Sequence, residues 1–250
     1  MTEAERRAAL EAVASEIRGC TRCRLHERRI QAVPGEGHPS TEVVFVGEGP
    51  GESEDRQGRP FVGRSGEVLE GLLASVGWRR DEVFITNVVK CRPPGNRTPE
   101  PDEVAACAPY LRRQLEILDP ALVVALGSPA LKRFAPGVAI SGAHGTVRPA
   151  DPATGARDAS LVPMFHPAFY LRGGTTREAY EADMARIPAA LEASRARRAS
   201  GAAAVPSGSP GPSGTAAAPD PGGSAALEPD RRTASAVGAD TAALDQMTTF

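Results

Sequence analysis

The chain has 250 residues, of which 41% are apolar, so it can bury a sizeable core, and its formal net charge at pH 7 is only −2. This charge neither requires nor excludes a nucleic-acid partner, because a local basic stripe can bind phosphate on a nearly neutral protein. No stretch approaches the roughly eighteen apolar residues of a membrane helix, and no apolar run follows a basic start. The composition therefore argues against a membrane protein, and we expect a cytoplasmic one.

Composition divides the chain into two parts. Residues 199–250 consist mainly of Ala, Pro, Gly, Ser and Thr, and a segment with so few large apolar side chains cannot offset the entropy lost on folding. Residues 1–198 contain 27 Lys and Arg against 26 Asp and Glu, and they hold the helix and strand patterns. We expect one folded domain over residues 1–198 and a disordered tail over residues 199–250.

The folded part begins with a helical pattern and continues with alternating strands and helices. Apolar residues at Leu10, Val13 and Ile17 predict a helix over residues 2–17. Short apolar runs predict four buried strands, over residues 43–46, 83–89, 122–126 and 161–165. Further helical patterns occupy residues 66–76, 101–118, 129–134 and 176–197. This order predicts a three-layer α/β/α sandwich with a central, mostly parallel, four-stranded sheet.

Three polar loops follow predicted strands, over residues 47–52, 87–97 and 166–172. In sheets of parallel strands, ligands bind at the edge where the carboxyl ends of the strands lie. We therefore expect the three loops to converge on one site.

The four cysteines form a C-x2-C pair, a long gap and a C-x15-C pair, at Cys20, Cys23, Cys91 and Cys107. In a reducing compartment this spacing favours metal ligands over disulfides. Four thiolates serve zinc and iron–sulfur clusters alike, so the residues leave the metal open. With either occupant, the site would staple the first helix onto the sheet.

Several loop residues have both a structural and a functional interpretation. The glycines of residues 47–52 fit a tight turn or a phosphate cradle, although the loop lacks the dinucleotide and Walker signatures. Phe61 fits a core position or a platform that stacks on a base. Asn87 lies inside an apolar run, where its amide must find hydrogen-bond partners, either within the fold or on the edge of a planar base.

His166 ends the last predicted strand, and Pro167 prevents that strand from simply continuing. A lone histidine is usually structural, but one at the same edge as Asn87 can donate a hydrogen bond to negative charge on a leaving group. The three other histidines lack this placement and are expected at the surface: His26, His38 and His144.

Four segments follow one another along the chain in a characteristic order. They are Gly47-Glu-Gly-Pro-Gly-Glu-Ser-Glu-Asp, Gly58-Arg-Pro-Phe-Val-Gly, Asn87-Val-Val-Lys-Cys-Arg-Pro-Pro-Gly-Asn-Arg and His166-Pro-Ala-Phe-Tyr-Leu-Arg. Together they resemble the family 4 uracil-DNA glycosylases. The resemblance spans residues 15–190 and includes all four cysteines.

The resemblance implies a monofunctional hydrolase of base excision repair, which flips uracil out of DNA and cuts its N-glycosidic bond. It implies a [4Fe–4S] cluster on the four cysteines, with zinc as the alternative occupant. The implied partner is DNA that contains uracil, and we expect a monomer. The catalytic residues that it implies are Glu48, Asn87 and His166. The substrate-binding residues are Gly47, Gly49, Glu54, Phe61 and Arg172.

The sequence departs from the wider superfamily at two places in the first motif. Where other members have an aspartate or asparagine, this chain has Gly49, so Glu48 becomes the candidate for orienting water. Where some relatives exclude thymine with a tyrosine, this chain has small residues such as Gly51. A branch that becomes trapped on DNA carries a basic, histidine-bearing insertion, which is not evident here, so ordinary turnover is expected.

Two other functions remain as alternatives at this point. One is a catalytically silent relative that binds damaged DNA with the same fold. The other is a metal-stapled nucleotide hydrolase that uses residues 47–52 on phosphates. For the tail, binding to a repair or replication protein competes with an inert, solubilising role.

Overall fold

The computed structural model describes residues 1–201, and the predicted tail lies outside the described residues from residue 202 onward. The α/β/α class is confirmed, but the sheet has six strands, not four, in the order β1-β3-β2-β4-β6-β5. The strands are β1 Glu36–Gly37, β2 Val43–Gly47, β3 Phe84–Asn87, β4 Leu122–Leu126, β5 Arg148–Pro149 and β6 Ser160–Met164. The four predicted strands form the parallel centre, while β1 and β5 pair antiparallel at its two edges.

The central strands are apolar because both of their faces are covered. Every residue of β2, β3, β4 and β6 is buried. Successive side chains point to opposite faces, so Val44 and Val46 pack into one core cluster while Val43 and Phe45 pack into the other. The two edge strands were missed because two residues cannot produce a period.

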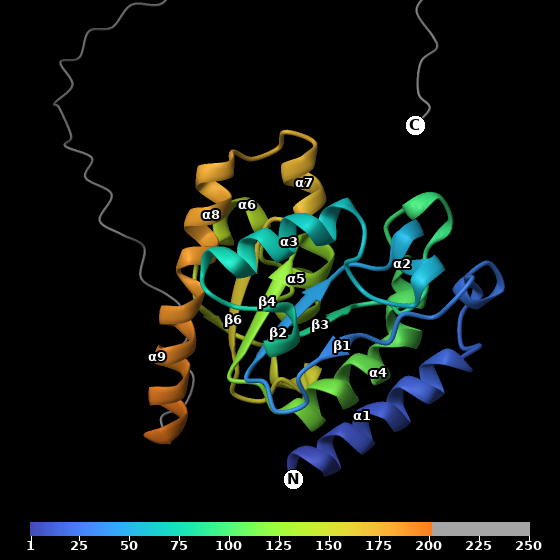
Figure 1. Cartoon of the computed structure of the whole chain (residues 1–250), viewed down its shortest axis with the longest axis horizontal. Coiled ribbons are helices and arrows are strands. Elements are labelled where there is room, and N and C mark those ends of the chain that lie inside the picture. Colours follow the sequence, from blue (N-terminus) through green and yellow to red (C-terminus); the bar gives the residue numbers. More distant parts are fainter. Residues whose placement is uncertain (202–250) are drawn as a thin grey trace, which may run out of the picture. The chain divides into compact units, whose positions relative to one another are not determined.

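Two groups of helices cover the two faces of the sheet (Figure 1). On one face, α1 Glu3–Arg18 lies beside α4 Pro101–Leu118, followed by the short α5 Ser128–Phe134. On the other face lie α3 Arg64–Ser75, α8 Arg177–Ala185 and α9 Ile187–Ala199. The predicted helices over residues 2–17, 66–76, 101–118 and 129–134 are thus present within two residues at each end.

The last helix differs from its prediction because the pattern over residues 176–197 is two helices. A new helix starts at Ile187, with Pro188 in its first turn, where the missing N–H of a proline is tolerated. Three short helices had no sequence signal of sufficient length: α2 Glu52–Gln57, α6 Ile140–Ala143 and α7 Pro167–Leu171. Two of them, α2 and α7, begin within polar loops that the sequence had assigned to the site.

None of the helices in residues 1–201 combines the length and apolar composition that crossing a bilayer requires.

Candidate active site

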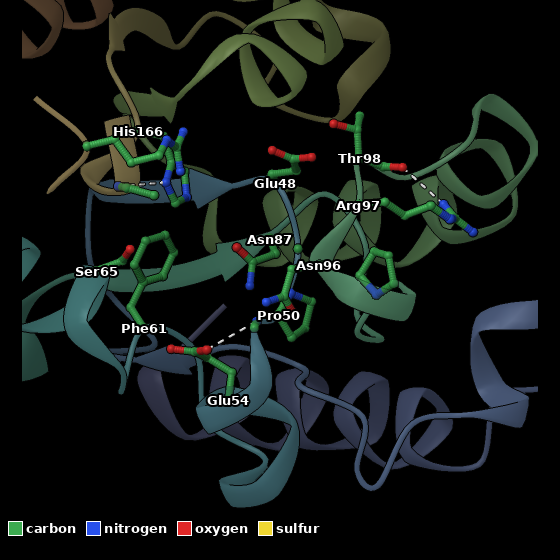
Figure 2. A pocket seen from close by; sticks show the side chains of 15 residues that line it. Glu48, Pro50, Glu54, Phe61, Ser65, Asn87, Asn96, Arg97, Thr98 and His166 are labelled. Carbon is green, nitrogen blue, oxygen red and sulfur yellow. Dashed lines mark hydrogen bonds between the residues drawn. The ribbon is translucent and has the colours of Figure 1, made fainter. Parts of the chain in front are cut away.

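A cavity of about 400 Å³ opens at the carboxyl ends of β2, β3 and β6, where the three polar loops converge as predicted (Figure 2). Its size is typical of a site for a small molecule or a single nucleotide unit. The cavity is lined by Glu48, Gly49, Pro50, Gly51, Glu54, Phe61, Ser65, Asn87, Pro93, Asn96, Arg97, Thr98, His166, Ala168 and Arg172.

Seven of the eight residues that the sequence assigned to catalysis or substrate binding line this cavity, and only Gly47 does not. Sequence reasoning missed Ser65 in the first turn of α3, and Thr98, which follows the predicted loop. The polar segment 87–97 was expected at this cavity. Which of its side chains line the cavity depends on backbone turns, and these have no periodic pattern in the sequence.

Asn87 is the last residue of β3 and is 1% exposed. Its side-chain oxygen Oδ1 is buried and has no hydrogen-bond partner among the described residues. A buried polar atom left unpaired costs about 1–3 kcal/mol. In a wall of a cavity, such an atom marks the place where a ligand can supply the missing donor.

Gly47 does not line the cavity, but it sets how closely two lining residues can approach each other. It pairs with Asn87 across β2 and β3. A Cβ at position 47 would meet the Phe61 ring at 2.6 Å and, closer still, Asn87 Oδ1. Only glycine therefore lets the ring and the amide approach each other at the end of the two strands.

Phe61 adopts a left-handed backbone conformation with φ of +50°, which is uncommon for a bulky residue. Glu54 holds the following turn, since its carboxylate accepts hydrogen bonds from the backbone N–H groups of Val62 at 2.8 Å and Gly63 at 2.9 Å. Arg80 donates to the carbonyl oxygens of Pro60 and Phe61 on the other side. Two opposite charges thus keep the ring at the cavity wall.

Glu54 also accepts from the backbone N–H of Gly51 at 3.1 Å. Its carboxylate, although it lines the cavity, therefore joins the first loop to the Phe61 turn. Glu54 therefore stabilises the backbone of both segments that form this side of the cavity.

His166 caps the N-terminus of α7, and its Nδ1 accepts a hydrogen bond from the backbone N–H of Ala168 at 3.1 Å. An accepting Nδ1 carries no proton, so in the neutral ring Nε2 is the donor. Burial, aided by the positive charge of Arg172, lowers the pKa of His166 to about 4. The ring is therefore neutral near pH 7, and its centroid lies 5.7 Å from that of Phe61.

Glu48 lies half-buried at the cavity, between His166 and Thr98 in Figure 2. Burial raises the pKa of its carboxyl, against the lowering effects of the Thr98 hydroxyl and the Arg172 charge. Arg172 is exposed at the end of α7 and has no ion pair among residues 1–201. Arg97, by contrast, is held by Glu103 at 2.7 Å, so its charge is already matched.

The four cysteines line a second, smaller cavity between the end of α1, the following turn and α4. None of the four forms a disulfide. Three of their sulfur atoms accept hydrogen bonds: Cys20 Sγ from the backbone N–H of Arg22 at 3.5 Å, Cys91 Sγ from Arg29 Nη1 at 3.1 Å and Cys107 Sγ from the backbone N–H of Lys90 at 3.3 Å. Burial raises the pKa of Cys107 to about 11, so a metal must displace a proton to bind there.

Within residues 1–201, no group of three or more His, Cys, Asp and Glu side chains is arranged to hold a single metal ion. The donor set itself suits a sulfur-ligated cluster, because four cysteines line one cavity and N–H groups are directed at three of their sulfur atoms.

Ion pairs connect the two cavities through the first turn of α4. Arg24, in the turn that carries the first cysteine pair, binds Asp102 at 2.6 Å. Arg97, on the wall of the larger cavity, binds the fully buried Glu103 through both of its terminal nitrogens. The cysteine turn and the polar loop are therefore both anchored to the first turn of α4, one at Asp102 and the other at Glu103, as the shared position of the cysteines and the loop had suggested.

All three histidines expected at the surface, His26, His38 and His144, are half-buried instead. His26 lines the cysteine cavity, and its Nδ1 lies 2.7 Å from the carbonyl oxygen of Cys23. His144 pairs with the buried Asp183 at 2.6 Å and packs on Phe165. None of the three lines the larger cavity, which agrees with leaving them out of the site.

The family model described as the Uracil DNA glycosylase superfamily matches residues 34–187, which is more than half of the chain. The type-4 uracil-DNA glycosylase of Thermotoga maritima is 49% identical over 163 residues, which cover 65% of this chain and 83% of the relative. That of Archaeoglobus fulgidus is 41% identical, covering 72% of this chain and 92% of the relative. The chain belongs to the type-4 uracil-DNA glycosylases.

A type-5 uracil-DNA glycosylase of Mycobacterium bovis is more distant, with 34% identity over 47% of this chain. As a type-4 family member, the protein is a uracil-DNA glycosylase, a DNA-repair hydrolase that acts on N-glycosidic bonds in DNA. The superfamily match begins at residue 34, so it contains Cys91 and Cys107 but not the first cysteine pair. The larger cavity lies wholly within the match.

The packing behind the site of this glycosylase predicts the effect of Gly47→Ala. The added methyl would push Asn87 and Phe61 apart, so we expect uracil release to fall by at least ~100-fold, the scale of a misplaced catalytic group. Initial rates on an oligonucleotide with one uracil measure this.

Gly71→Ala is the matched control, because a Cβ at this helical position meets nothing within 4 Å. It should keep full activity and slightly increase resistance to urea, since alanine favours a helix. Equal activity of the two variants would contradict the close-packing argument.

Proposed function

We propose that this glycosylase acts monofunctionally, binding a flipped-out deoxyuridine in the larger cavity and hydrolysing its N-glycosidic bond to leave an abasic site. The observation that supports this most is the unpaired Oδ1 of Asn87, a buried acceptor beside Phe61 and a neutral His166. Flipping costs a few kcal/mol, which contacts in the pocket and with phosphates offset.

Recognition of uracil would rest on the amide of Asn87 and the ring of Phe61. Oδ1 would accept the N3–H of uracil, while the amide N–H would donate to the neighbouring O4. Cytosine presents an unprotonated nitrogen and an amino group at these positions, which would leave both contacts repulsive. The Phe61 ring would stack on the base, an interaction worth about 1–3 kcal/mol per base in single-strand binders.

His166 would stabilise the leaving uracil as a neutral donor. Its Nδ1 is occupied by the Ala168 N–H, so Nε2 carries the proton and would donate it as a hydrogen bond to the O2 of uracil. Negative charge develops on the base as the bond breaks, and a preorganised donor lowers the energy of that state more than that of bound substrate. Neutrality lets the ring donate without transferring its proton.

Glu48 would orient the water that adds to the sugar. It lines the same cavity, whereas Gly49 beside it offers no side chain. Arg172, exposed at the rim without an ion pair among the described residues, is suited to a DNA phosphate.

We also propose that Cys20, Cys23, Cys91 and Cys107 hold a [4Fe–4S] cluster. When bound, the cluster would supply a structural cross-link between α1, the Cys91 segment and α4. Arg29 and the Lys90 backbone would donate to two of the sulfur ligands, an arrangement that tunes such clusters. Residues 1–198 would then form the catalytic part, since every residue of both cavities lies between Ile17 and Arg172.

Asn87→Ala tests the central assignment. Purified protein is incubated with an oligonucleotide bearing one uracil, and alkali then cuts any abasic site. The unaltered protein should give cleavage at uracil but not at thymine or cytosine, and Asn87→Ala should lose ~100-fold or more, as for an essential transition-state contact. Gln57→Ala, an exposed amide at the end of α2, should be unaffected.

Tight binding to the uracil oligonucleotide without base release, by an intact and cluster-loaded protein, would instead indicate a catalytically silent relative.

The pH dependence tests the state of His166. Because its pKa is about 4, the ring is neutral throughout the physiological range, and kcat should show no step near the usual histidine pKa of about 6.5.

The lowered pKa of His166 in the folded protein also predicts a pH dependence of stability. The stability that the neutral ring contributes should be lost as the pH falls from 6.5 through 4. Urea unfolding should show this loss in the unaltered protein and not in His166→Gln.

A kcat step at pH 6.5 that disappears in His166→Gln would show a histidine that titrates normally and would contradict the neutral-donor role.

Metal analysis tests the cluster. Anaerobically purified protein should contain about four irons and four sulfides per chain, as a [4Fe–4S] cluster requires. Cys107→Ala should lose both and unfold at lower urea, because the cross-link between α4 and the Cys91 segment is gone. One zinc per chain without sulfide would replace the iron–sulfur assignment with a zinc staple.

A further inference from the structure

Lys90 is the one lysine among the fully buried side chains of the described residues, with 1% of its surface exposed. Its Nζ donates three hydrogen bonds, to Thr86 Oγ1 at 2.6 Å, to the Asn87 carbonyl oxygen at 2.8 Å and to Gln114 Oε1 at 2.7 Å. All three acceptors are neutral, and Lys90 has no carboxylate in ion-pair range within residues 1–201. A buried ammonium without a counter-charge is costly, so an anionic partner is expected nearby.

The surroundings of Lys90 offer one source of negative charge. Lys90 lines the cysteine cavity, precedes Cys91 in the chain, and donates its backbone N–H to Cys107 Sγ. Four thiolates on a [4Fe–4S] core with two positive charges leave a net charge of roughly −2. The cysteine site, when loaded, would therefore supply the missing counter-charge from the cavity that Lys90 lines.

The ammonium also contacts the backbone of an active-site residue. Its bond to the Asn87 carbonyl holds the backbone of the residue whose amide faces the larger cavity. The remaining acceptors are fixed in turn, because Thr86 Oγ1 and Gln114 Nε2 both donate to the Pro34 carbonyl at 2.9 and 2.8 Å. Lys90 thus joins a buried network, through its side chain, to the Cys107 sulfur, through its backbone N–H.

We propose that Lys90 is a positioning residue that couples the cluster to the active site, acting as the cluster's counter-charge and as the tether of Asn87. The inference rests on the proposed cluster and on the role proposed for Asn87. It assigns the cluster an electrostatic effect on the geometry of uracil recognition, in addition to cross-linking. Lys90 touches neither substrate nor the reacting atoms.

Lys90→Met tests both parts, because methionine keeps the length of the chain and removes the charge and its hydrogen bonds. In the cluster-loaded full chain, we expect kcat for uracil release to fall by ~10- to 100-fold, as for a catalytic group displaced by less than about 1 Å, with KM changed less than threefold. The reduction potential of the cluster should become more negative, because loss of a nearby positive charge favours the oxidised cluster.

Thr86→Val is the matched control. It removes one acceptor of the same ammonium but keeps the charge and the bond to Asn87, so kcat should fall less than threefold and the potential should stay unchanged. If Lys90→Met does not fold, Lys90→Met/Gln114→Met removes the ammonium together with a partner that would otherwise be left unpaired, and is measured in its place.

A cluster-loaded Lys90 variant with the unaltered kcat would overturn the tether, and one with the unaltered potential would overturn the counter-charge. Failure of the proposed function looks different, because the unaltered protein would then release no uracil or hold no iron and sulfide.

Discussion

The structure depends on the parallel pairing of β2 with β3, which brings Gly47 opposite Asn87 at the carboxyl ends of the two strands. Both strands are buried on both faces, so their register is fixed by the two core clusters rather than by the site. The absence of a side chain at Gly47 then allows the Asn87 amide and the Phe61 ring to meet. Hydrophobic packing thereby holds a polar group in a place where the fold alone does not satisfy it.

Charged side chains complete the site mostly by holding backbone. Glu54 and Arg80 fix the left-handed turn at Phe61, and Arg97 is bound to Glu103 beneath the loop. Such buried or half-buried pairs contribute more to positioning than to net stability, because desolvation offsets much of their attraction. The result is a rigid pocket in which His166 stays neutral and Asn87 keeps an acceptor available.

Much of the fold could be predicted from sequence because the central strands are short apolar runs and α1 and α4 have clear apolar periodicity. The site could be located because parallel strands deliver Gly47, Asn87 and His166 to one edge. The remainder depended on contacts between distant residues. The sequence alone assigns Glu54 to the binding of a ligand. Its hydrogen bonds to the backbone N–H groups of Gly51 and Gly63 depend on the turn after Phe61, which no local sequence pattern predicts. The burial of Lys90 is equally invisible in a polar-looking segment.

The two-residue strands at the ends of the sheet have a consequence for how the molecule behaves in a crowded solution. Exposed sheet edges are templates on which another chain can add a strand and begin to aggregate. Here β1 ends at Gly37, whose φ of +142° departs from strand geometry, and β5 ends at Pro149, which has no N–H to donate. Each edge therefore offers too little regular backbone to recruit a partner strand, and the apolar centre of the sheet, which carries the larger cavity, is shielded from misassembly.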